Sequence, residues 1–144
     1  MRTRALLRGA WLAAGLLLVA AGCGSGPAPL TAVRGKVSYR GVLLTTGTIV
    51  FTPDAARGCR GEIAFADIQP DGTYDLKTGA SYGAVPGWHR ITVCALLPAT
   101  AAPPGPSRAI PVSLLPPRYR DPQLSGLSCE VKADQMNRID FQLD

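Results

Sequence analysis

Apolar residues are distributed in two different ways along this chain. Near its start, an uncharged apolar run occupies residues 9–22 and follows three arginines, Arg2, Arg4 and Arg8. Beyond residue 33, apolar and polar residues alternate over short stretches that prolines or glycines interrupt. An apolar run led by basic residues is typical of an export signal, whereas alternation with a period of two indicates β-strands with one buried face.

The alternation predicts seven short strands. In the first, over residues 33–39, Val33, Gly35, Val37 and Tyr39 share one face, and arginine, lysine and serine occupy the other. The residues that share a face in the other six strands are Ile49 with Phe51, Ile63 with Phe65, Tyr74 with Leu76, Ile91 with Val93 and Ala95, Leu127 with Cys129 and Val131, and Ile139 with Phe141 and Leu143.

Turn-forming sequences separate these strands. Pro70-Asp71-Gly72 combines a fixed φ with residues that tolerate positive φ, and it predicts a tight hairpin. Tyr39-Arg40-Gly41 is expected to turn the first strand, and residues 134–137 the last pair. Short strands at regular spacing predict an all-β fold, a seven-stranded antiparallel Greek-key β-sandwich. An immunoglobulin-like sandwich is the main alternative.

Residues 19–23 read Val-Ala-Ala-Gly-Cys and resemble the lipobox of bacterial lipoproteins, with Ala20 where leucine is usual. The resemblance implies that Cys23 receives a diacylglycerol, with long acyl chains such as palmitate, and becomes the mature N-terminus. Residues 1–22 are then a cleaved signal peptide. The apolar run is too short for a comfortable membrane span, which takes about 20 residues. Each buried methylene of an acyl chain contributes about 0.8 kcal/mol, so two long acyl chains hold a small protein on a membrane. An ordinary secretory signal or an uncleaved anchor is the alternative.

Loss of residues 1–22 lowers the formal net charge from +5 to +2. No block of basic residues remains, so nucleic acid is not expected as a partner. The remaining length suits one domain. Small residues and prolines over 24–32 predict a tether that reaches at most about 30 Å, so residues 23–32 form the lipidated cysteine and tether and residues 33–144 the domain.

Four motifs resemble, in their order, the carboxypeptidase regulatory-like domains of transthyretin-like (prealbumin-like) fold. They are Val33-Arg-Gly-Lys-Val37, Gly47-Thr-Ile-Val-Phe51, Asp71-Gly-Thr-Tyr74 and Pro86-Gly-Trp-His-Arg-Ile-Thr-Val93. Residues 117–122 and 125–127 are similar to the closing segment of small exported lipoproteins that carry one such domain. The resemblance implies a transthyretin-like sandwich and leaves the biochemical role open.

Catalytic chemistry finds little support. His89 is the only histidine, and it shares a face with Ile91, so we expect a packed imidazole rather than an acid–base group. The enzyme of the superfamily, 5-hydroxyisourate hydrolase, requires more histidines and a C-terminal Tyr-Arg-Gly-Ser. Here Tyr119-Arg120 is internal and Asp121-Pro122 follows it. The chain is therefore predicted not to be an enzyme.

Metal and cofactor sites are not predicted either. Cys59, Cys94 and Cys129 lack the close pairs of a zinc site. The acids around one hairpin, at 67, 71 and 75, do not match a calcium loop and are expected to be solvated turn residues. After export the thiols meet an oxidising compartment. Side-chain parity places Cys59 on the face of Ile63 and Phe65 and Cys129 on that of Leu127 and Val131, whereas Cys94 shares a face with Arg90 and Thr92. It therefore favours a disulfide between Cys59 and Cys129 with Cys94 unpaired, and the sequence leaves the other pairings open.

Two features are candidates for contact with a partner. Trp88 lies on the opposite parity from Ile91 and is predicted to be exposed beside Arg90, where it can anchor a protein or a sugar ring or cover a strand edge. The segment 97–116 carries six prolines, which predict an exposed loop or an extended edge segment that acts as a spacer; a binding role is the alternative.

Together these features predict a non-enzymatic, lipid-anchored cell-envelope protein, an interaction or structural module without a cofactor that contacts an envelope protein or polysaccharide. Its domain is expected to face the periplasm, and Gly24 after Cys23 favours the outer membrane by analogy with other lipoproteins. A small-ligand carrier of transthyretin type, with a channel between subunits, is the alternative. A hydrolase is a third, disfavoured hypothesis.

Overall fold

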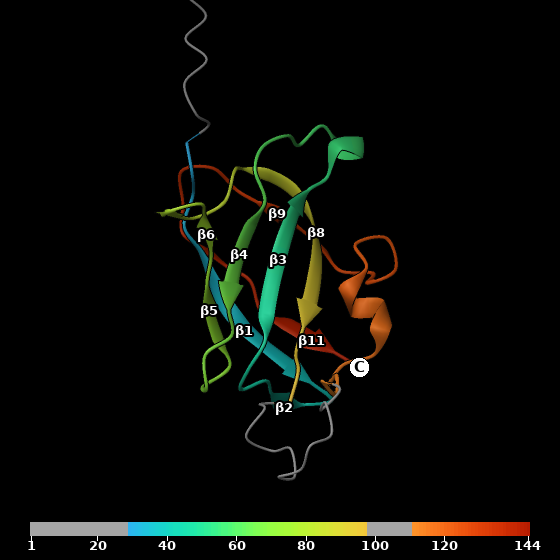
Figure 1. Cartoon of the computed structure of the whole chain (residues 1–144). Helices are drawn as coiled ribbons and strands as arrows, with labels where there is room; N and C mark the ends of the chain where they lie inside the picture. Colours follow the sequence, from blue (N-terminus) through green and yellow to red (C-terminus); the bar gives the residue numbers. More distant parts are fainter. Residues whose placement is uncertain (1–28, 98–110) are drawn as a thin grey trace, which may run out of the picture.

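Two β-sheets pack face to face in this protein and form a β-sandwich (Figure 1). The structure is a computed structural model that describes residues 29–97 and 111–144. The predicted signal peptide, Cys23 and most of the tether lie outside the described residues, as do residues 98–110 of the proline-rich segment. The prediction of an all-β sandwich is confirmed.

One sheet has six strands, and each neighbouring pair in it is antiparallel. Its central strands are β3 (Thr48–Pro53) and β8 (Gly87–Cys94), which pair over six residues of each. In order across the sheet, the strands are β7 (Ser81–Tyr82), β6 (Lys77–Thr78), β4 (Ala64–Asp67), β3, β8 and β9 (Ser128–Val131).

The other sheet is built around β1 (Val33–Tyr39), which has partners on both edges. Its partners are β2 (Val42–Leu43), β5 (Thr73–Asp75), β10 (Asn137–Arg138) and β11 (Phe141–Leu143). The pairs of β1 with β10 and with β11 are parallel, so this sheet is mixed rather than wholly antiparallel as predicted. Two short 3-10 helices, η1 (Ala55–Arg57) and η3 (Pro117–Arg120), lie outside the sheets.

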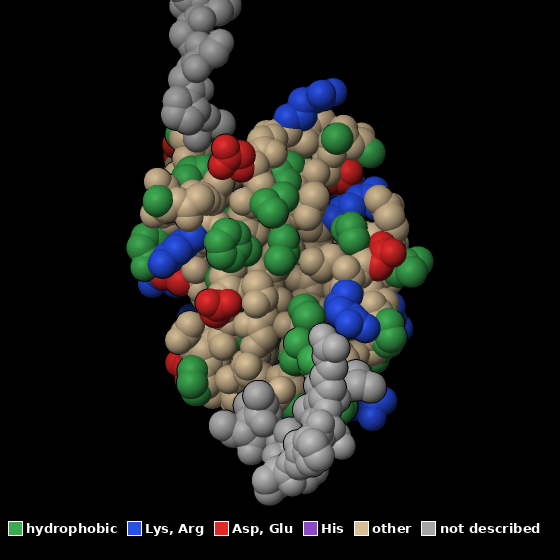
Figure 2. Space-filling view, viewed as in Figure 1, with side chains coloured by type: hydrophobic (Ala, Val, Ile, Leu, Met, Phe, Trp, Pro, Cys, Tyr) green, Lys and Arg blue, Asp and Glu red, His purple; other side chains and the backbone are tan. Residues whose placement is uncertain are grey.

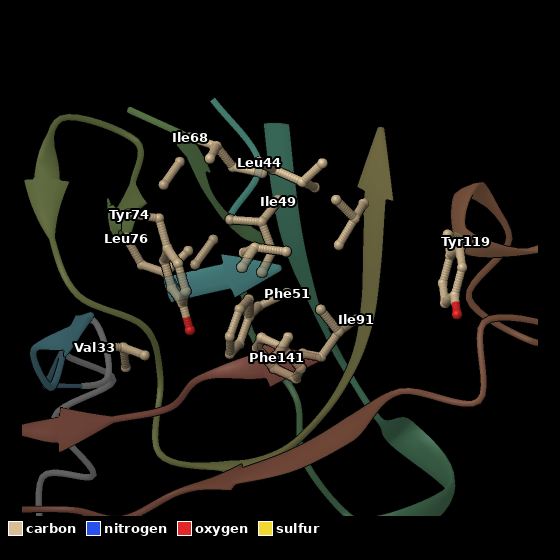
Figure 3. Packing of buried hydrophobic residues seen from close by; sticks show 14 of the residues in the cluster. Val33, Leu44, Ile49, Phe51, Ile68, Tyr74, Leu76, Ile91, Tyr119 and Phe141 are labelled. Atoms are coloured by element: carbon tan, nitrogen blue, oxygen red, sulfur yellow. The ribbon is translucent and has the colours of Figure 1, made fainter. Parts of the chain in front are cut away.

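The core fills the space between the two sheets. Phe51 of β3 lies near Tyr74 and Phe141, at ring-centroid distances of 6.2 and 5.9 Å, and the Phe51–Phe141 pair is edge-to-face. Figure 3 shows these rings and Ile91 between strands of both sheets, whereas Tyr119 lies in η3, beyond β8. Offset and edge-to-face aromatic pairs add to the stabilisation that burial alone provides.

Buried faces agree with the predicted alternation in most strands, and β4 is the exception. The sequence pattern placed Ile63 and Phe65 inside, yet both are exposed, and Ala64 and Ala66 are buried instead. The register explains the reversal, since Ala64 lies opposite Phe51 and Ala66 opposite a buried isoleucine of β3. Large residues of β3 fill the core at this point, so only small side chains fit beside them.

The predicted hairpin at Pro70-Asp71-Gly72 is confirmed. The amide of Gly72 donates to the carbonyl of Gln69 at 2.8 Å, and Gly72 has a φ of 79°. The Asp71 carboxylate accepts from the amide of Thr73 at 3.0 Å and from its hydroxyl at 2.6 Å. These hydrogen bonds lower the pKa of Asp71 because they favour the charged form. Asp71 is therefore a turn residue, as expected.

The other two predicted turns are also present. Arg40 and Gly41 have φ values of 51° and 80° and connect β1 to β2. Asp134 has a φ of 58°, and the side chain of Asn137 accepts from the amide of Lys132 and donates to its carbonyl, both at 2.9 Å.

The described parts of the predicted tether and of the proline-rich segment form backbone hydrogen bonds with other segments. Thr31 is buried and forms an antiparallel bridge with Ala84, so the folded body begins earlier than residue 33. On the C-terminal side of the proline-rich segment, the amide of Leu97 donates to Val112 and that of Leu114 to Ala95, both at 2.9 Å. This part of the segment is extended and pairs with residues 95–97, which follow β8, and so it has the second of the two predicted forms, an extended edge segment.

Candidate functional site

An exposed apolar patch lies on the outer face of the six-stranded sheet. Its members, Ile63, Phe65 and Tyr82, have exposed fractions of 53%, 44% and 63%, and we call them the outer patch. The register places Phe65 beside Lys77 and Lys77 beside Tyr82, so three adjacent strands align these side chains in one row. The Lys77 ammonium lies 4.6 Å from the centre of the Tyr82 ring, a cation–π contact. Figure 2 shows hydrophobic side chains gathered over β3 and β4 on this face.

A groove adjoins the outer patch, and the strand connections explain why it exists. Strands β4 and β6 pair only at Phe65 and Lys77. On the N-terminal side of β6 the chain crosses at Leu76 to the other sheet, where β5 pairs with β1. The two sheets therefore separate between β4 and β5. The opening has a volume of about 580 Å³, and we call it the seam groove.

Basic and acidic side chains line the seam groove together with aromatic ones. The basic residues are Arg34, Lys36, Lys77 and Arg138, and the acidic residues are Asp67 and Asp75. Arg34 pairs with Asp75 at 3.6 Å, and both side chains are about half exposed. The outer-patch residues Phe65 and Tyr82 form part of the wall. The seam groove therefore offers positive charge beside flat apolar surfaces.

Trp88 and Arg90, the residues predicted to form an interaction surface, contact other segments of this chain. The Arg57 guanidinium lies 4.2 Å from the centre of the Trp88 ring, and Trp88 is only partly exposed. Arg90 forms an ion pair with Asp54 at 3.3 Å and donates to Gln123. Both side chains thus hold neighbouring loops against β8, which favours the structural role over the anchoring one.

Asp54 organises the turn beside these two residues. It is buried, its carboxylate accepts from the amide of Ala56 at 3.1 Å, and its own amide donates to the carbonyl of Trp88 at 2.8 Å. It acts as the N-cap of η1 and faces two arginines, Arg57 and Arg90. No pattern in the sequence pointed to this cluster.

His89 is a packed core residue, as predicted. Its side chain is 0% exposed, and its ring lies 5.9 Å from that of Phe51. Nδ1 lies 3.0 Å from the carbonyl oxygen of Gly87, and since this oxygen can only accept, Nδ1 carries the proton. Nε2 has no hydrogen-bond partner among the described residues. Burial lowers the pKa of His89 because it disfavours the charged form.

The three later cysteines are free thiols in the structure, so the predicted disulfide between Cys59 and Cys129 is not formed in it. The Cys59 thiol lies 3.6 Å from the carbonyl oxygen of Pro86, whereas Cys129 lies opposite His89 in the β8–β9 register. Burial raises the pKa of Cys59 and raises that of Cys129 to about 12. Both are therefore poor nucleophiles at neutral pH.

The parity that assigned Cys59 to the interior depended on Ile63 and Phe65, which are exposed. Cys59 is nevertheless buried, because the chain bends at Gly61, with a φ of 149°, before β4 begins. The interior position of Cys59 thus agrees with the prediction, although it results from the bend at Gly61 and not from the alternation. Cys94 lies on the outer side of β8, as its parity indicated, and is partly exposed.

Tyr119, part of the internal Tyr-Arg fragment noted above, has a structural position. It is buried, and its hydroxyl lies 2.8 Å from the carbonyl oxygen of Asp144 and 3.0 Å from the Asp144 amide nitrogen, which donates to it. Arg118 pairs with the Asp144 carboxylate at 2.9 Å. The η3 segment thereby holds the end of β11 in place.

Three further features were sought in the described part of the chain: the lipidation site, a metal site and a membrane-spanning helix. Cys23, the predicted lipidation site, is not among the described residues. Within residues 29–97 and 111–144, no cluster of histidine, cysteine or acidic residues could hold a metal ion. The same residues contain no helix long and apolar enough to cross a bilayer.

Comparison with protein-family models, with curated proteins and with solved structures finds no match to this chain. Its function is therefore inferred from the geometry above.

Proposed function

We propose that this protein is a non-enzymatic, lipid-anchored cell-envelope protein whose β-sandwich, of transthyretin-like type, serves as a contact module. The observation that carries this proposal is the outer patch beside the seam groove. An exposed apolar patch bordered by charged residues is typical of a surface that binds a partner. The only imidazole is buried, and the thiols of Cys59 and Cys129 have raised pKa values, so none of these three groups is activated for reaction. The exposed outer patch is the feature that supports a function, and that function is contact with a partner.

The anchor is supported by the lipobox-like sequence that ends at Cys23. The chain from Cys23 to Thr31 reaches at most about 28 Å when extended. The N-terminal end of β1 lies at one end of the sandwich, at the top of Figure 1. Thr31, which precedes β1, is bridged to Ala84, two residues from Tyr82 of the outer patch. The outer patch therefore reaches the end of the domain at which the tether enters, so we expect its partner close to the membrane surface.

Membrane fractionation of a Cys23→Ala variant tests the anchor. We expect wild-type protein in the membrane fraction and the variant in the soluble exported fraction, because the variant has no sulfur to carry acyl chains. Cys94→Ala is the matched control, since it removes a thiol from the folded domain and should leave the protein on the membrane. If Cys23→Ala stays on membranes as firmly as the wild type, the lipid anchor is wrong.

Site-specific crosslinking tests the contact surface. A photoreactive amino acid at position 65, in the outer patch, should crosslink to an envelope component in intact cells. The control position is Leu124, which has an exposed fraction of 66% and lies between η3 and β9. Crosslinks of equal yield and identity from both positions would mean that the outer patch has no special role.

The alternative, a small-ligand carrier of transthyretin type, requires a channel between subunits. The seam groove differs from such a channel because residues of a single chain line it. Sedimentation at high protein concentration separates the two functions. A stable dimer or tetramer is required by the carrier, whereas the contact module works as a monomer.

A further inference from the structure

Basic and aromatic side chains both line the seam groove, and together they limit the class of ligand that it can bind. Its basic side chains outnumber its acidic ones, and Phe65 and Tyr82 present exposed ring surfaces along its wall. We propose that the seam groove binds a segment of an anionic polysaccharide, with uronic-acid carboxylates on its lysines and sugar rings against its aromatic residues. This inference deepens the proposed contact module and rests on it.

The lysines provide the attraction for the carboxylates. Within the described residues, no carboxylate lies within ion-pair distance of the ammonium group of Lys36 or Lys77. Arg34, in contrast, is paired with Asp75. Lys36 is on β1 and Lys77 on β6, so the two ammonium groups come from different sheets and belong to the lining of one groove. An extended anion that lies along the seam can reach both.

The aromatic residues provide flat apolar surfaces for sugar rings. Phe65 and Tyr82 are in the same cross-strand row, on either side of Lys77. A pyranose ring has an apolar face of C–H groups, which packs on an aromatic ring as other apolar groups do. Each carboxylate of a uronic acid is attached directly to its ring, so one sugar unit can contact Lys77 and a neighbouring ring at the same time.

The acidic and neutral polar residues favour a polysaccharide over an acidic peptide. Asp67 and Asp75 accept hydrogen bonds only, and Gln69 and Thr73 also line the groove. The two aspartates repel a uronate carboxylate as much as the acidic side chain of a peptide. A uronic acid, however, carries several hydroxyl donors for the aspartates in addition to its carboxylate, whereas an acidic side chain carries none. The seam groove is also open to solvent, so a long polymer can lie in it without threading.

Isothermal titration calorimetry with full-length protein in detergent micelles tests the inference. The probe is oligogalacturonate, a chain of galacturonic acids. Its matched control is the same oligomer with methyl-esterified carboxyl groups, which keeps the rings and removes the charge. A poly-glutamate peptide of similar charge represents the acidic-peptide alternative. We expect binding of oligogalacturonate, at least about tenfold weaker binding of the ester, and weakening at high salt.

Variants locate the binding. Lys36→Ala with Lys77→Ala, and separately Phe65→Ala, should each weaken oligogalacturonate binding about tenfold or more. Lys132→Ala is the matched control, because Lys132 is exposed and does not line the seam groove, and it should change the affinity less than about twofold. The urea midpoint of each variant verifies its folding. If a groove variant does not fold, the wild-type comparison of acid and ester probes still decides.

Four results would overturn the inference: no binding of oligogalacturonate, equal binding of its methyl ester, tighter binding of poly-glutamate, or equal weakening by Lys132→Ala. None of these results depends on the anchor, because the purified protein is used. Conversely, a Cys23→Ala variant that remains on membranes would refute the anchor and leave polysaccharide binding intact.

Discussion

Replacement of Gly35 by alanine is the most direct test of the packing between β1 and the end of the chain. A methyl group at Gly35 would lie 2.6 Å from the carbonyl carbon of Ile139, still closer to its oxygen, and 3.1 Å from the Asp140 carboxylate. Gly35 lies between the part of β1 that pairs with β10 and the part that pairs with β11, and the connecting residues pass directly over it. The backbone of Gly35 does not have positive φ, so the conflict is steric.

Three hydrogen bonds give the magnitude. The amide of Ile139 donates to the carbonyl of Arg34 at 2.9 Å, and its carbonyl accepts from the Tyr74 hydroxyl at 2.6 Å. The Asp140 carboxylate accepts from the amide of Lys36 at 2.8 Å. The methyl group displaces both acceptor residues, and each lost hydrogen bond removes about 1 kcal/mol. We therefore expect the free energy of unfolding to fall by about 3 kcal/mol, a large part of the 5–15 kcal/mol typical of a domain.

Urea unfolding followed by circular dichroism measures this loss. Gly41→Ala is the matched control, because Gly41 has a φ of 80° and no atom within 4 Å of an added methyl group. We expect that variant to lose about 1 kcal/mol, from backbone strain alone. If Gly35→Ala loses no more than Gly41→Ala, the close approach of residues 139–140 to β1 is wrong.

Three further predictions concern single side chains. Folding lowers the pKa of His89, so the unfolded chain takes up a proton at a higher pH than the folded one. We expect the free energy of unfolding to fall as pH drops below about 6.5, by up to about 1.4 kcal/mol per pH unit. Urea titrations between pH 7.5 and 5 measure this slope, and a slope that persists in His89→Leu would contradict the prediction. Tyr119→Phe removes the hydroxyl that contacts Asp144, and we expect a loss of about 1–2 kcal/mol in urea unfolding; an unchanged midpoint would show that the contact contributes nothing. Asp54→Ala removes a helix cap and the partner of Arg90, and we expect the free energy of unfolding to fall by about 2–3 kcal/mol. Asp54→Asn should recover about 1 kcal/mol, because its amide oxygen can still cap the helix. Thermal unfolding of both variants tests this, and equal losses of stability would argue against the cap.

The positions of most strands could be predicted from the sequence, because alternation and turn residues are local signals. The order Val33, Gly35, Val37 became a buried face of β1, and Pro70-Asp71-Gly72 became a hairpin. Strand β4 shows where local signals fail. Large apolar residues alternate with alanines there, and the side that faces the core is decided by Ile49 and Phe51 of the neighbouring strand.

The candidate site could not be predicted from the sequence, for a related reason. The seam groove exists because the chain changes sheets at Leu76, a step that a continuous alternating run does not reveal. Its basic residues come from positions as far apart as Arg34 and Arg138. Trp88, which looked like a contact residue because of its type and parity, is partly covered by Arg57, which lies far from it in the sequence.

The way β1 is held has a consequence for mechanical load. Residues 31–39 are bridged to Ala84, pair with β5 on one side and run parallel to β10 and β11 on the other. A pull at Thr31 along the strand axis loads the perpendicular hydrogen bonds to β5 and the slanted ones to β10 and β11 at the same time. These bonds must therefore break together in shear rather than one after another. The first strand is thus the part of this fold best suited to transmit a pulling force.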